Sequence, residues 1–248
     1  SGKKLIDLSK LCNILSSLPK LKRIRYITSH PSDINDELIL EHKNNKKLMP
    51  FLHLPVQSGS NKILKKMNRK YTKENYIDLV NKIKFEVKNM AFSSDFIVGY
   101  PGETDQEFLE TFCFINESEI SYLHVFTYSE RPNTEAAKMK DQVPLEIRNK
   151  RSKILRILSI KKRRAFYESQ LGKVLTVLFE NENKKGYIYG FTENYVKVKA
   201  PWNPKLANTL HKIRLGKFGR SQYKGLTFFL SSENRIYYLS EKGNKIYC

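Results

Sequence analysis

Polar and glycine residues recur directly after short apolar runs in the first half of this sequence. Four such stretches occur, at residues 28–33, 57–60, 99–104 and 127–131. The third reads Gly-Tyr-Pro-Gly-Glu-Thr, and its glycines leave backbone that no side chain covers. A flat or bulky ligand could approach the chain there, although the same glycines would also serve a tight turn.

The segments around these stretches alternate between strands and helices. Short apolar runs at residues 23–28, 51–56, 96–98 and 122–129 are typical of strands, and amphipathic segments separate them. Parallel pairing is expected, because a crossover between parallel strands needs a dozen or more residues. The four polar stretches would then lie together at the carboxyl edge of a half-barrel, the usual place for a site. Four strands do not close a barrel, so we expect further strands before residue 1.

The second half of the sequence changes pattern twice. A strongly basic helix is predicted over residues 144–170, either as a solvated linker or as a nucleic-acid contact. Alternation with period two then predicts strands at residues 173–180, 186–192 and 194–200, with Tyr187 and Tyr189 on one face and Ile188 on the other. Lysines and aromatics interleave here, as in small OB-like barrels that bind RNA, although about half of these aromatics would be core. Residues 217–248 are hard to interpret, with possible strands at 228–230 and 236–239.

The composition narrows the class of protein. The net charge is +20 and most of the excess lies in the C-terminal half, which favours a polyanionic partner, although a lysine-rich proteome would also give such a charge. No apolar run is long enough to span a membrane. The three cysteines, Cys12, Cys113 and Cys248, have neither disulfide nor metal-ligand spacing, so we expect no metal ligands and a reducing, cytoplasmic setting.

Four ordered blocks carry a resemblance to a known family. Residues 25–31, 53–60, 67–72 and 95–104 resemble the radical S-adenosylmethionine tRNA methylthiotransferases, and residues 172–200 resemble the RNA-binding TRAM domain of those enzymes. Up to about residue 114 the sequence more closely resembles the subfamily acting on N6-dimethylallyladenosine. Residues 121–204 are closer to the subfamily acting on N6-threonylcarbamoyladenosine.

The resemblance implies a fold and a domain order. The fold class is α/β, a partial (truncated) radical SAM β/α barrel followed by a small all-β OB-like TRAM barrel. The expected boundaries are residues 1–135 for the half-barrel, 136–170 for the basic linker helix and 171–216 for the TRAM domain, with an uncertain tail at 217–248. The family holds its 4Fe–4S cluster with a CxxxCxxC loop that is absent here, so we expect a fragment whose cluster ligands lie outside this chain and which is inactive alone.

The resemblance also implies an activity and its site. The family adds a 2-methylthio group to a modified adenosine beside the anticodon, with S-adenosylmethionine and 4Fe–4S clusters as cofactors. The residues expected to contact S-adenosylmethionine lie at strand ends: Gln57, Ser58, Ile97, Val98, Gly99, Val125, Phe126 and Thr127. No catalytic residue is assigned, because His53 is interpreted as a core histidine and His30 stays open.

The expected partner is the tRNA anticodon stem-loop, bound by a monomer without any membrane contact. The candidate RNA contacts are the basic residues of the linker helix and of the second domain, together with one aromatic: Arg69, Lys161, Lys162, Arg163, Arg164, Tyr195, Lys197 and Lys199. Arg69 could equally meet the cofactor carboxylate or lie on the surface.

Other interpretations of the sequence stay open. A ribosomal-protein aspartate methylthiotransferase would share the half-barrel but have less need of a basic second half. A non-catalytic RNA-binding module would share the basic half but lack a CxxxCxxC loop in the full gene. An ordinary α/β barrel enzyme with a phosphate site is weaker, because neither G-x-x-x-x-G-K nor GxGxxG occurs.

Overall fold

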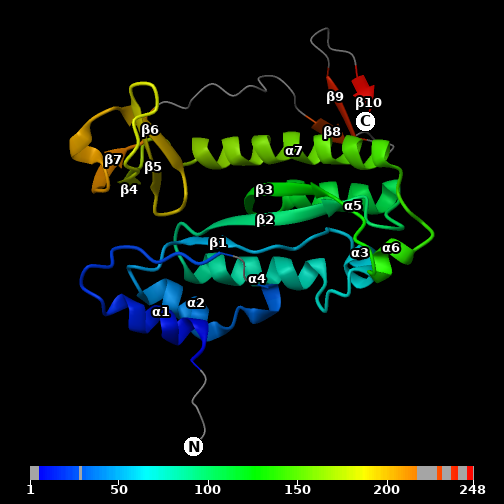
Figure 1. Cartoon of the computed structure of the whole chain (residues 1–248), viewed down its shortest axis with the longest axis horizontal. Coiled ribbons are helices and arrows are strands. Elements are labelled where there is room, and N and C mark those ends of the chain that lie inside the picture. The colour runs from blue at the N-terminus through cyan, green and yellow to red at the C-terminus, as the bar shows by residue number, and fades with distance from the viewer. Residues whose placement is uncertain (1–5, 28–29, 217–227, 231–235, 240–244, 248) are drawn as a thin grey trace, which may run out of the picture. The chain divides into compact units, whose positions relative to one another are not determined.

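The structure is a computed structural model that describes residues 6–27, 30–216, 228–230, 236–239 and 245–247 (Figure 1). The chain divides into two compact units. The first unit comprises Ser1–Leu52, Asn81–Ala91 and Tyr167–Phe218, and the second comprises His53–Val80, Phe92–Phe166 and Gly219–Cys248. Each unit is described by itself below.

A parallel sheet forms the centre of the second unit. Its strand order is β1-β2-β3, where β1 is Phe51–His53, β2 is Ala91–Val98 and β3 is Ile120–Thr127. Strands β2 and β3 pair in parallel, with Asp95 opposite His124, and a further parallel bridge joins Gln57 to Phe96. The carboxyl ends of these three strands therefore lie at one edge, as the sequence predicts for three of its four polar stretches. The fourth prediction depends on Thr28 and Ser29, which lie outside the described residues.

Helices cover one face of this sheet. They are α3 (Asn61–Lys66), α4 (Lys73–Glu86), α5 (Asp105–Glu117) and α7 (Leu145–Glu168), and the short α6 (Glu135–Lys138) between β3 and α7 buries no residue. Figure 1 shows α7 running alongside β3, and Ser159 of α7 donates a hydrogen bond to the Leu123 carbonyl of that strand. Phe96 on β2 is fully buried and its ring centroid lies 6.2 Å from that of Phe114 on α5. Alternate residues of β2 and β3 thus point into a helix-covered core, and the residues between them point the other way.

The first unit begins with α1 (Leu8–Ser16), the short 3₁₀ turn η1 (Pro31–Asp33) and α2 (Asp36–Asn44). The prediction of a strand at residues 23–28 is wrong for the described residues, because only Ile24 forms a bridge, to Leu48. The reason lies in the two arginines of this segment. Arg23 donates to the Phe191 carbonyl at 2.9 Å and Arg25 donates to the Thr192 carbonyl at 2.6 Å, so the segment is held by side chains rather than by a ladder.

An antiparallel sheet makes up the rest of the first unit. Its order is β6-β5-β4-β7, with β4 (Val174–Phe179), β5 (Tyr187–Thr192), β6 (Lys197–Pro201) and β7 (Leu210–Arg214), and η2 (Pro204–Leu206) precedes β7. Ile188 is fully buried beside Val177 and Phe179, whereas Tyr187 is 40% exposed. The predicted alternation of β5 is therefore confirmed. Strand β7 was not predicted from the sequence, and β6 begins three residues later than expected.

The tail contributes three short antiparallel strands in the order β10-β9-β8: β8 (Phe228–Leu230), β9 (Ile236–Leu239) and β10 (Lys245–Tyr247). The first two coincide with the strands that the sequence suggested. Among the described residues, no helix is both long enough and apolar enough to cross a membrane.

Candidate functional site

The face of the parallel sheet that the helices leave uncovered has titratable and aromatic side chains close together. We call this surface the open face. The residues that pair across β2 and β3 on this side are Asp95 with His124 and Ile97 with Phe126. The side chain of His124 is 50% exposed and Phe126 is 51% exposed. An exposed aromatic ring thus lies next to a carboxylate and an imidazole on one sheet surface.

A carboxylate between two imidazoles is the centre of the open face. Asp95 Oδ2 lies 3.2 Å from His53 Nε2, and Asp95 Oδ1 lies 3.0 Å from His124 Nδ1. Burial alone would raise the pKa of Asp95, but hydrogen bonds from the two histidines outweigh it and hold that pKa below its ordinary value. Asp95 is therefore a stable anion between two nitrogen donors.

The carboxyl edge of the sheet is built from backbone in unusual conformations. Gln57 has a φ of 75°, and its backbone exchanges hydrogen bonds with Asp95 and Ile97 of the neighbouring strand at 2.9 Å each. Gly99 has a φ of 72°, and its N–H donates to Glu103 Oε2 at 2.6 Å. A left-handed residue thus follows β2 directly and another lies in the bridge beyond β1, where Gln57 is partly exposed.

Two buried arginines of α7 fix the turn that follows β2. Arg151 Nη1 lies 2.8 Å from Glu103 Oε2, and the side chains of these residues are 6% and 0% exposed. Burial raises the pKa of Glu103, and its hydrogen bond from Gly99 and the charge of Arg151 oppose that rise. A Cβ added at Gly99 would lie 2.3 Å from Arg148 Cγ, so the turn is packed directly against the helix.

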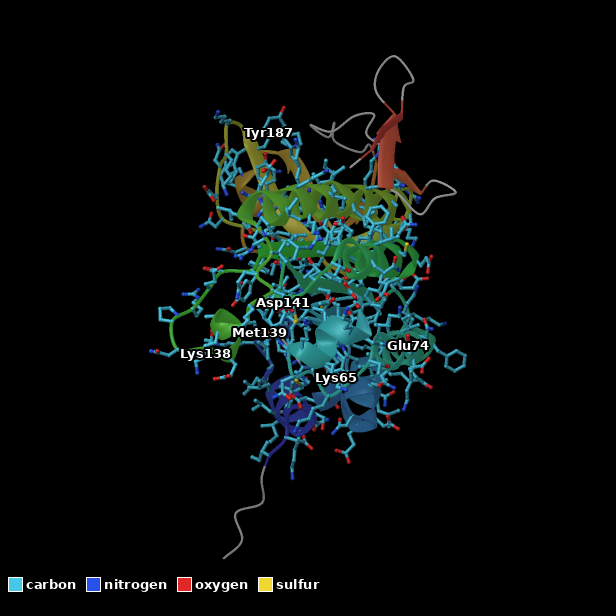
Figure 2. All side chains as sticks on the ribbon, turned by 90° about the vertical axis from the view of Figure 1, so that its right-hand side faces the viewer. Lys65, Glu74, Lys138, Met139, Asp141 and Tyr187 are labelled. Atoms are coloured by element: carbon cyan, nitrogen blue, oxygen red, sulfur yellow. The ribbon has the colours of Figure 1, made fainter. Side chains whose placement is uncertain are left out.

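The segment after α6 also contacts the turn at residues 99–103. Gly102 N–H donates to the Asp141 carbonyl at 2.7 Å, and Asp141 Oδ2 lies 3.3 Å from Lys66 Nζ. Figure 2 shows Asp141 and Met139 near each other beside the α6 ribbon. The backbone at residues 99–103 is therefore held by α7 and by the segment that follows α6.

The structure separates the predicted cofactor residues into two groups. Ile97 and Phe126 lie on the open face, and Gln57 and Gly99 lie at its carboxyl edge. Val98 and Val125 point into the helix-covered core, as does the partly buried Thr127. Ser58 is fully buried and its Oγ lies 3.2 Å from Thr111 Oγ1.

Two further backbone observations bear on these residues. The Val125 carbonyl accepts a hydrogen bond from Arg156 at 3.3 Å, so this part of the β3 backbone is already engaged within the protein. The Val98 carbonyl accepts from Tyr128 N–H at 2.8 Å. The groups that remain accessible for a ligand are therefore the open-face side chains and the partly exposed Gln57 at the carboxyl edge.

An iron–sulfur cluster does not fit the thiols of this chain. Such clusters are held by several Cys thiolates in close spacing. Cys12 is buried in α1 and Cys113 is partly buried in α5, and burial raises the pKa of both thiols. Neither has a second cysteine near it in sequence. No step of a reaction is therefore assigned to a cluster on these residues.

A second candidate surface lies on the antiparallel sheet of the first unit. Lys199 Nζ lies 3.5 Å from the ring centroid of Tyr187, and Lys197 Nζ lies 5.1 Å from that of Tyr189. Figure 2 shows Tyr187 on the outside of these strands. We call Tyr187, Tyr189, Lys197 and Lys199 the lysine–tyrosine surface. Its exposed cations beside aromatic rings suit a nucleic-acid backbone with unstacked bases.

Tyr195 takes a different place from the two lysines that accompany it in the prediction. Its ring stacks on Phe51 at 4.5 Å and on Phe191 at 4.6 Å, and the Arg25 guanidinium lies 4.7 Å from its centroid. Burial, the largest cause, lowers the pKa of Arg25 to about 10. Tyr195 thus already has aromatic and cationic neighbours within the protein.

The remaining predicted RNA contacts lie on helices or just after one. Lys161, Arg163 and Arg164 are exposed along α7, whereas Lys162 Nζ lies 2.5 Å from the Ser118 carbonyl. Arg69 is partly buried after α3. Their role in RNA binding stays a prediction.

Comparisons with known proteins identify relatives of this chain. Residues 3–115 match the model of the radical SAM superfamily. The chain is 46% identical over 189 residues to the tRNA-2-methylthio-N(6)-dimethylallyladenosine synthase of Ehrlichia chaffeensis, covering 75% of this chain and 43% of that protein. It is 45% identical over 181 residues to the protein of the same name from Rickettsia felis, covering 73% of this chain and 41% of that protein.

A solved structure, coproporphyrinogen III oxidase (HemN) from Escherichia coli, described as a radical SAM enzyme, aligns with a TM-score of 0.41 and 19% identity, over 56% of this chain and 31% of that chain. This chain carries a radical SAM domain on a parallel α/β sheet. Within that superfamily it belongs to the methylthiotransferase family of enzymes. It spans less than half the length of the curated relatives that it matches.

Sequence reasoning missed the Asp95 cluster. His53 is buried as expected, but it is hydrogen-bonded to both Ser93 and Asp95 rather than being a simple core residue. Asp95 directly precedes the apolar run at residues 96–98 that the sequence predicts as a strand, and His124 lies in the strand predicted at residues 122–129. Only the pairing register, which the sequence does not give, brings them together.

Proposed function

We propose that this chain is the part of a tRNA methylthiotransferase that holds S-adenosylmethionine and the tRNA. The reaction is the addition of a 2-methylthio group to a modified adenosine, N6-threonylcarbamoyl- or N6-dimethylallyl-adenosine, beside the anticodon. The proposal rests mainly on the family membership, which relatives of 45–46% identity support. The open face and the lysine–tyrosine surface supply the two binding surfaces that such a reaction needs.

S-Adenosylmethionine fits the open face and its carboxyl edge. Phe126 and Ile97 offer apolar surface for the adenine, and the partly exposed Gln57 at the carboxyl edge offers its side-chain amide to the ribose or amino-acid part. The cofactor supplies the radical chemistry when bound, and the protein orients it and excludes water. The ligands of the cluster that this chemistry also needs are not among the cysteines of this chain.

The lysine–tyrosine surface would bind the tRNA anticodon stem-loop. Phosphates neutralise lysine ammonium groups, and the tyrosine rings offer faces to unstacked bases. Lys161, Arg163 and Arg164 of α7, and the partly buried Lys162 and Arg69, are proposed as further phosphate contacts. The protein would act as a monomer.

The RNA part of the proposal is tested by the affinity for an anticodon stem-loop at several salt concentrations. Lys197→Glu and Lys199→Glu should each weaken binding and reduce the salt slope by about 1, as expected for loss of one phosphate contact. Lys20→Glu, at an exposed turn after α1, is the matched control and should leave the slope unchanged. Unchanged binding in both sheet variants would exclude this surface.

The cofactor part is tested separately with S-adenosylhomocysteine, a stable analogue, by isothermal titration. Phe126→Asp places a charge on the open face and should abolish binding, because an adenine ring cannot replace the hydration of that charge. Phe85→Asp is the control, since Phe85 is 87% exposed on α4 and lies outside the open face. Equal loss in both variants would contradict the assignment.

The same binding measurements distinguish an RNA substrate from a protein substrate. A ribosomal-protein methylthiotransferase would bind its protein substrate and show no preference for the stem-loop. A binding module without catalysis would bind the stem-loop but not S-adenosylhomocysteine. Comparing stem-loops that carry either modified adenosine or plain adenosine would identify the substrate.

A further inference from the structure

We propose that His53, Asp95 and His124 form a binding site for one divalent transition metal of the zinc class. The site lies on the open face beside the surface proposed for S-adenosylmethionine, and its test with metal alone needs neither that cofactor nor a cluster. The donor atoms of the three residues all lie within 4.8 Å of one another. No other group of this composition occurs in the part of the chain that the structure describes.

The donor separations are those of ligands around one ion. Two donors at about 2.0–2.1 Å from a tetrahedral zinc ion lie roughly 3.3 Å apart. Asp95 Oδ2 lies 3.2 Å from His53 Nε2, and the other oxygen of the same carboxylate, Oδ1, lies 3.0 Å from His124 Nδ1. The ring centroids of the two histidines are 5.5 Å apart. Small rotations of side chains would therefore suffice to bring all three donors onto one ion.

The backbone holds these ligands on rigid elements. Each residue lies on a different strand of the parallel sheet, and Asp95 and His124 are directly paired in register. Ligands on neighbouring strands lose little further conformational freedom when an ion binds. The sheet is thus a preorganised support rather than a flexible loop.

A hydrogen bond behind the ligands has the form found in metal sites. His53 Nδ1 lies 2.8 Å from Ser93 Oγ, and this contact is buried. In the metal-free protein Nε2–H donates to Asp95, and an ion that takes the place of this proton would bind Nε2 while Nδ1–H donates to Ser93. Such outer contacts orient metal-binding imidazoles and tune their affinity.

The chemistry of the donors selects the kind of metal. Two imidazoles with one carboxylate suit Zn²⁺, Co²⁺ or Fe²⁺, whereas Ca²⁺ and Mg²⁺ prefer oxygen ligands alone. His124 is half exposed, so an ion bound there would keep open positions toward solvent. A metal with three protein ligands and an open position is one that can bind a further ligand.

The test uses the full chain, without a histidine tag, after removal of metals with a chelator. Cobalt(II) is titrated and its visible absorption recorded, since intense bands indicate four or five ligands rather than a hydrated ion. We expect one equivalent to bind. His124→Ala and Asp95→Asn should each weaken binding by more than about tenfold, and Ser93→Ala should weaken it by about tenfold.

His211→Ala is the matched control, because His211 lies on β7 outside the cluster. It should bind cobalt as the unchanged chain does, and circular dichroism should show all variants folded. The proposal is overturned if no cobalt spectrum develops, in which case the three residues form a hydrogen-bonded cluster only. It is equally overturned if the spectrum survives in His124→Ala or shows thiolate bands from Cys12 or Cys113.

Discussion

At the scale of single residues, the second unit contains a buried ion pair. Glu103 and Arg151 form an ion pair whose side chains are almost completely buried, and Glu103 also accepts the Gly99 N–H. A buried pair need not stabilise the fold, but loss of one partner leaves a charge without compensation. The turn at the end of β2 therefore depends on both residues being present.

Replacing Arg151 by Met should lower the free energy of unfolding by about 3–5 kcal/mol, because the Glu103 carboxylate would remain buried without its partner. The double variant Glu103→Gln/Arg151→Met should recover part of this loss. Arg163→Met, on an exposed position of the same helix, should change stability by less than about 0.5 kcal/mol. Urea unfolding measures all three, and equal effects of the two single variants would contradict the expectation.

A second prediction at this scale concerns pH. Burial opposes the ionisation of Glu107, but hydrogen bonds from Lys62 and Thr104 outweigh it and lower its pKa from 4.5 to about 2. The depressed folded-state pKa means that Glu107 contributes stability above pH 4.5 and that this contribution is lost as the pH falls toward about 2.

Unfolding free energies measured across that range check the sign. The difference between the unchanged chain and Glu107→Gln should be largest near neutral pH and shrink between pH 4.5 and 2. Glu117→Gln, at the exposed end of the same helix, is the control. A difference that grows on acidification would show that the carboxylate is not stabilised in the fold.

At the scale of elements, the antiparallel sheet depends on a close approach of two strands. A Cβ added at Gly190 on β5 would lie 2.4 Å from the Leu178 carbonyl oxygen and 2.8 Å from Phe179 Cα on β4. These are backbone atoms, so a side chain there would force the strands apart. The glycine is thus required by packing between strands rather than by its own conformation.

Gly190→Ala should therefore destabilise this sheet by roughly 1–3 kcal/mol, as expected for overpacking. Trp202, the single tryptophan, packs against the core of the sheet and reports its unfolding by fluorescence. Gly216→Ala is the control, since a Cβ there would meet nothing within 4 Å. A normal fluorescence transition in Gly190→Ala would mean that the strands can separate without cost.

The elements also show how far the sequence was sufficient. Alternation found β5 and placed Ile188 opposite Tyr187, and apolar runs between helices found β2 and β3. The strand expected at residues 23–28 failed because Arg23 and Arg25 bond to carbonyls more than 150 residues away in sequence. Contacts of that kind leave no periodic signal in the chain.

Only part of the candidate site could be predicted, because the sequence shows strand ends and alternation but not which distant residues pair. Gln57, Gly99, Ile97 and Phe126 lie where strand ends and alternation place them. The pairing of Asp95 with His124 depends on register, and the burial of Arg148 and Arg151 depends on partners outside α7. A helix rich in basic residues is expected to be exposed, so its two buried arginines could not be identified without the packing.

At the scale of the whole molecule, the net charge of +20 sets how the chain meets RNA. Lysines and arginines neutralise phosphates and release bound counterions, which makes the affinity fall as salt rises. This part of binding carries no sequence information. Selectivity for an anticodon stem-loop should therefore be greatest at salt concentrations where the general attraction is already weak.

We expect the affinity for a stem-loop to fall by a factor on the order of 10³–10⁵ between 50 and 200 mM salt if six to ten phosphates are contacted. An unrelated RNA hairpin of equal length should lose affinity at least as steeply. Fluorescence anisotropy at four salt concentrations measures both slopes. An affinity that does not change with salt would exclude phosphate contacts as the main source of binding.

The lysines that lie over tyrosine rings have a consequence for the entropy of association. Lys197 and Lys199 each rest on an aromatic face of the sheet before any RNA is present, so their long side chains already occupy a restricted set of rotamers. Immobilising such a side chain on binding costs about 0.5–1.5 kcal/mol. Part of that ordering is complete in the free protein, and an incoming phosphate meets ammonium groups that are held in place.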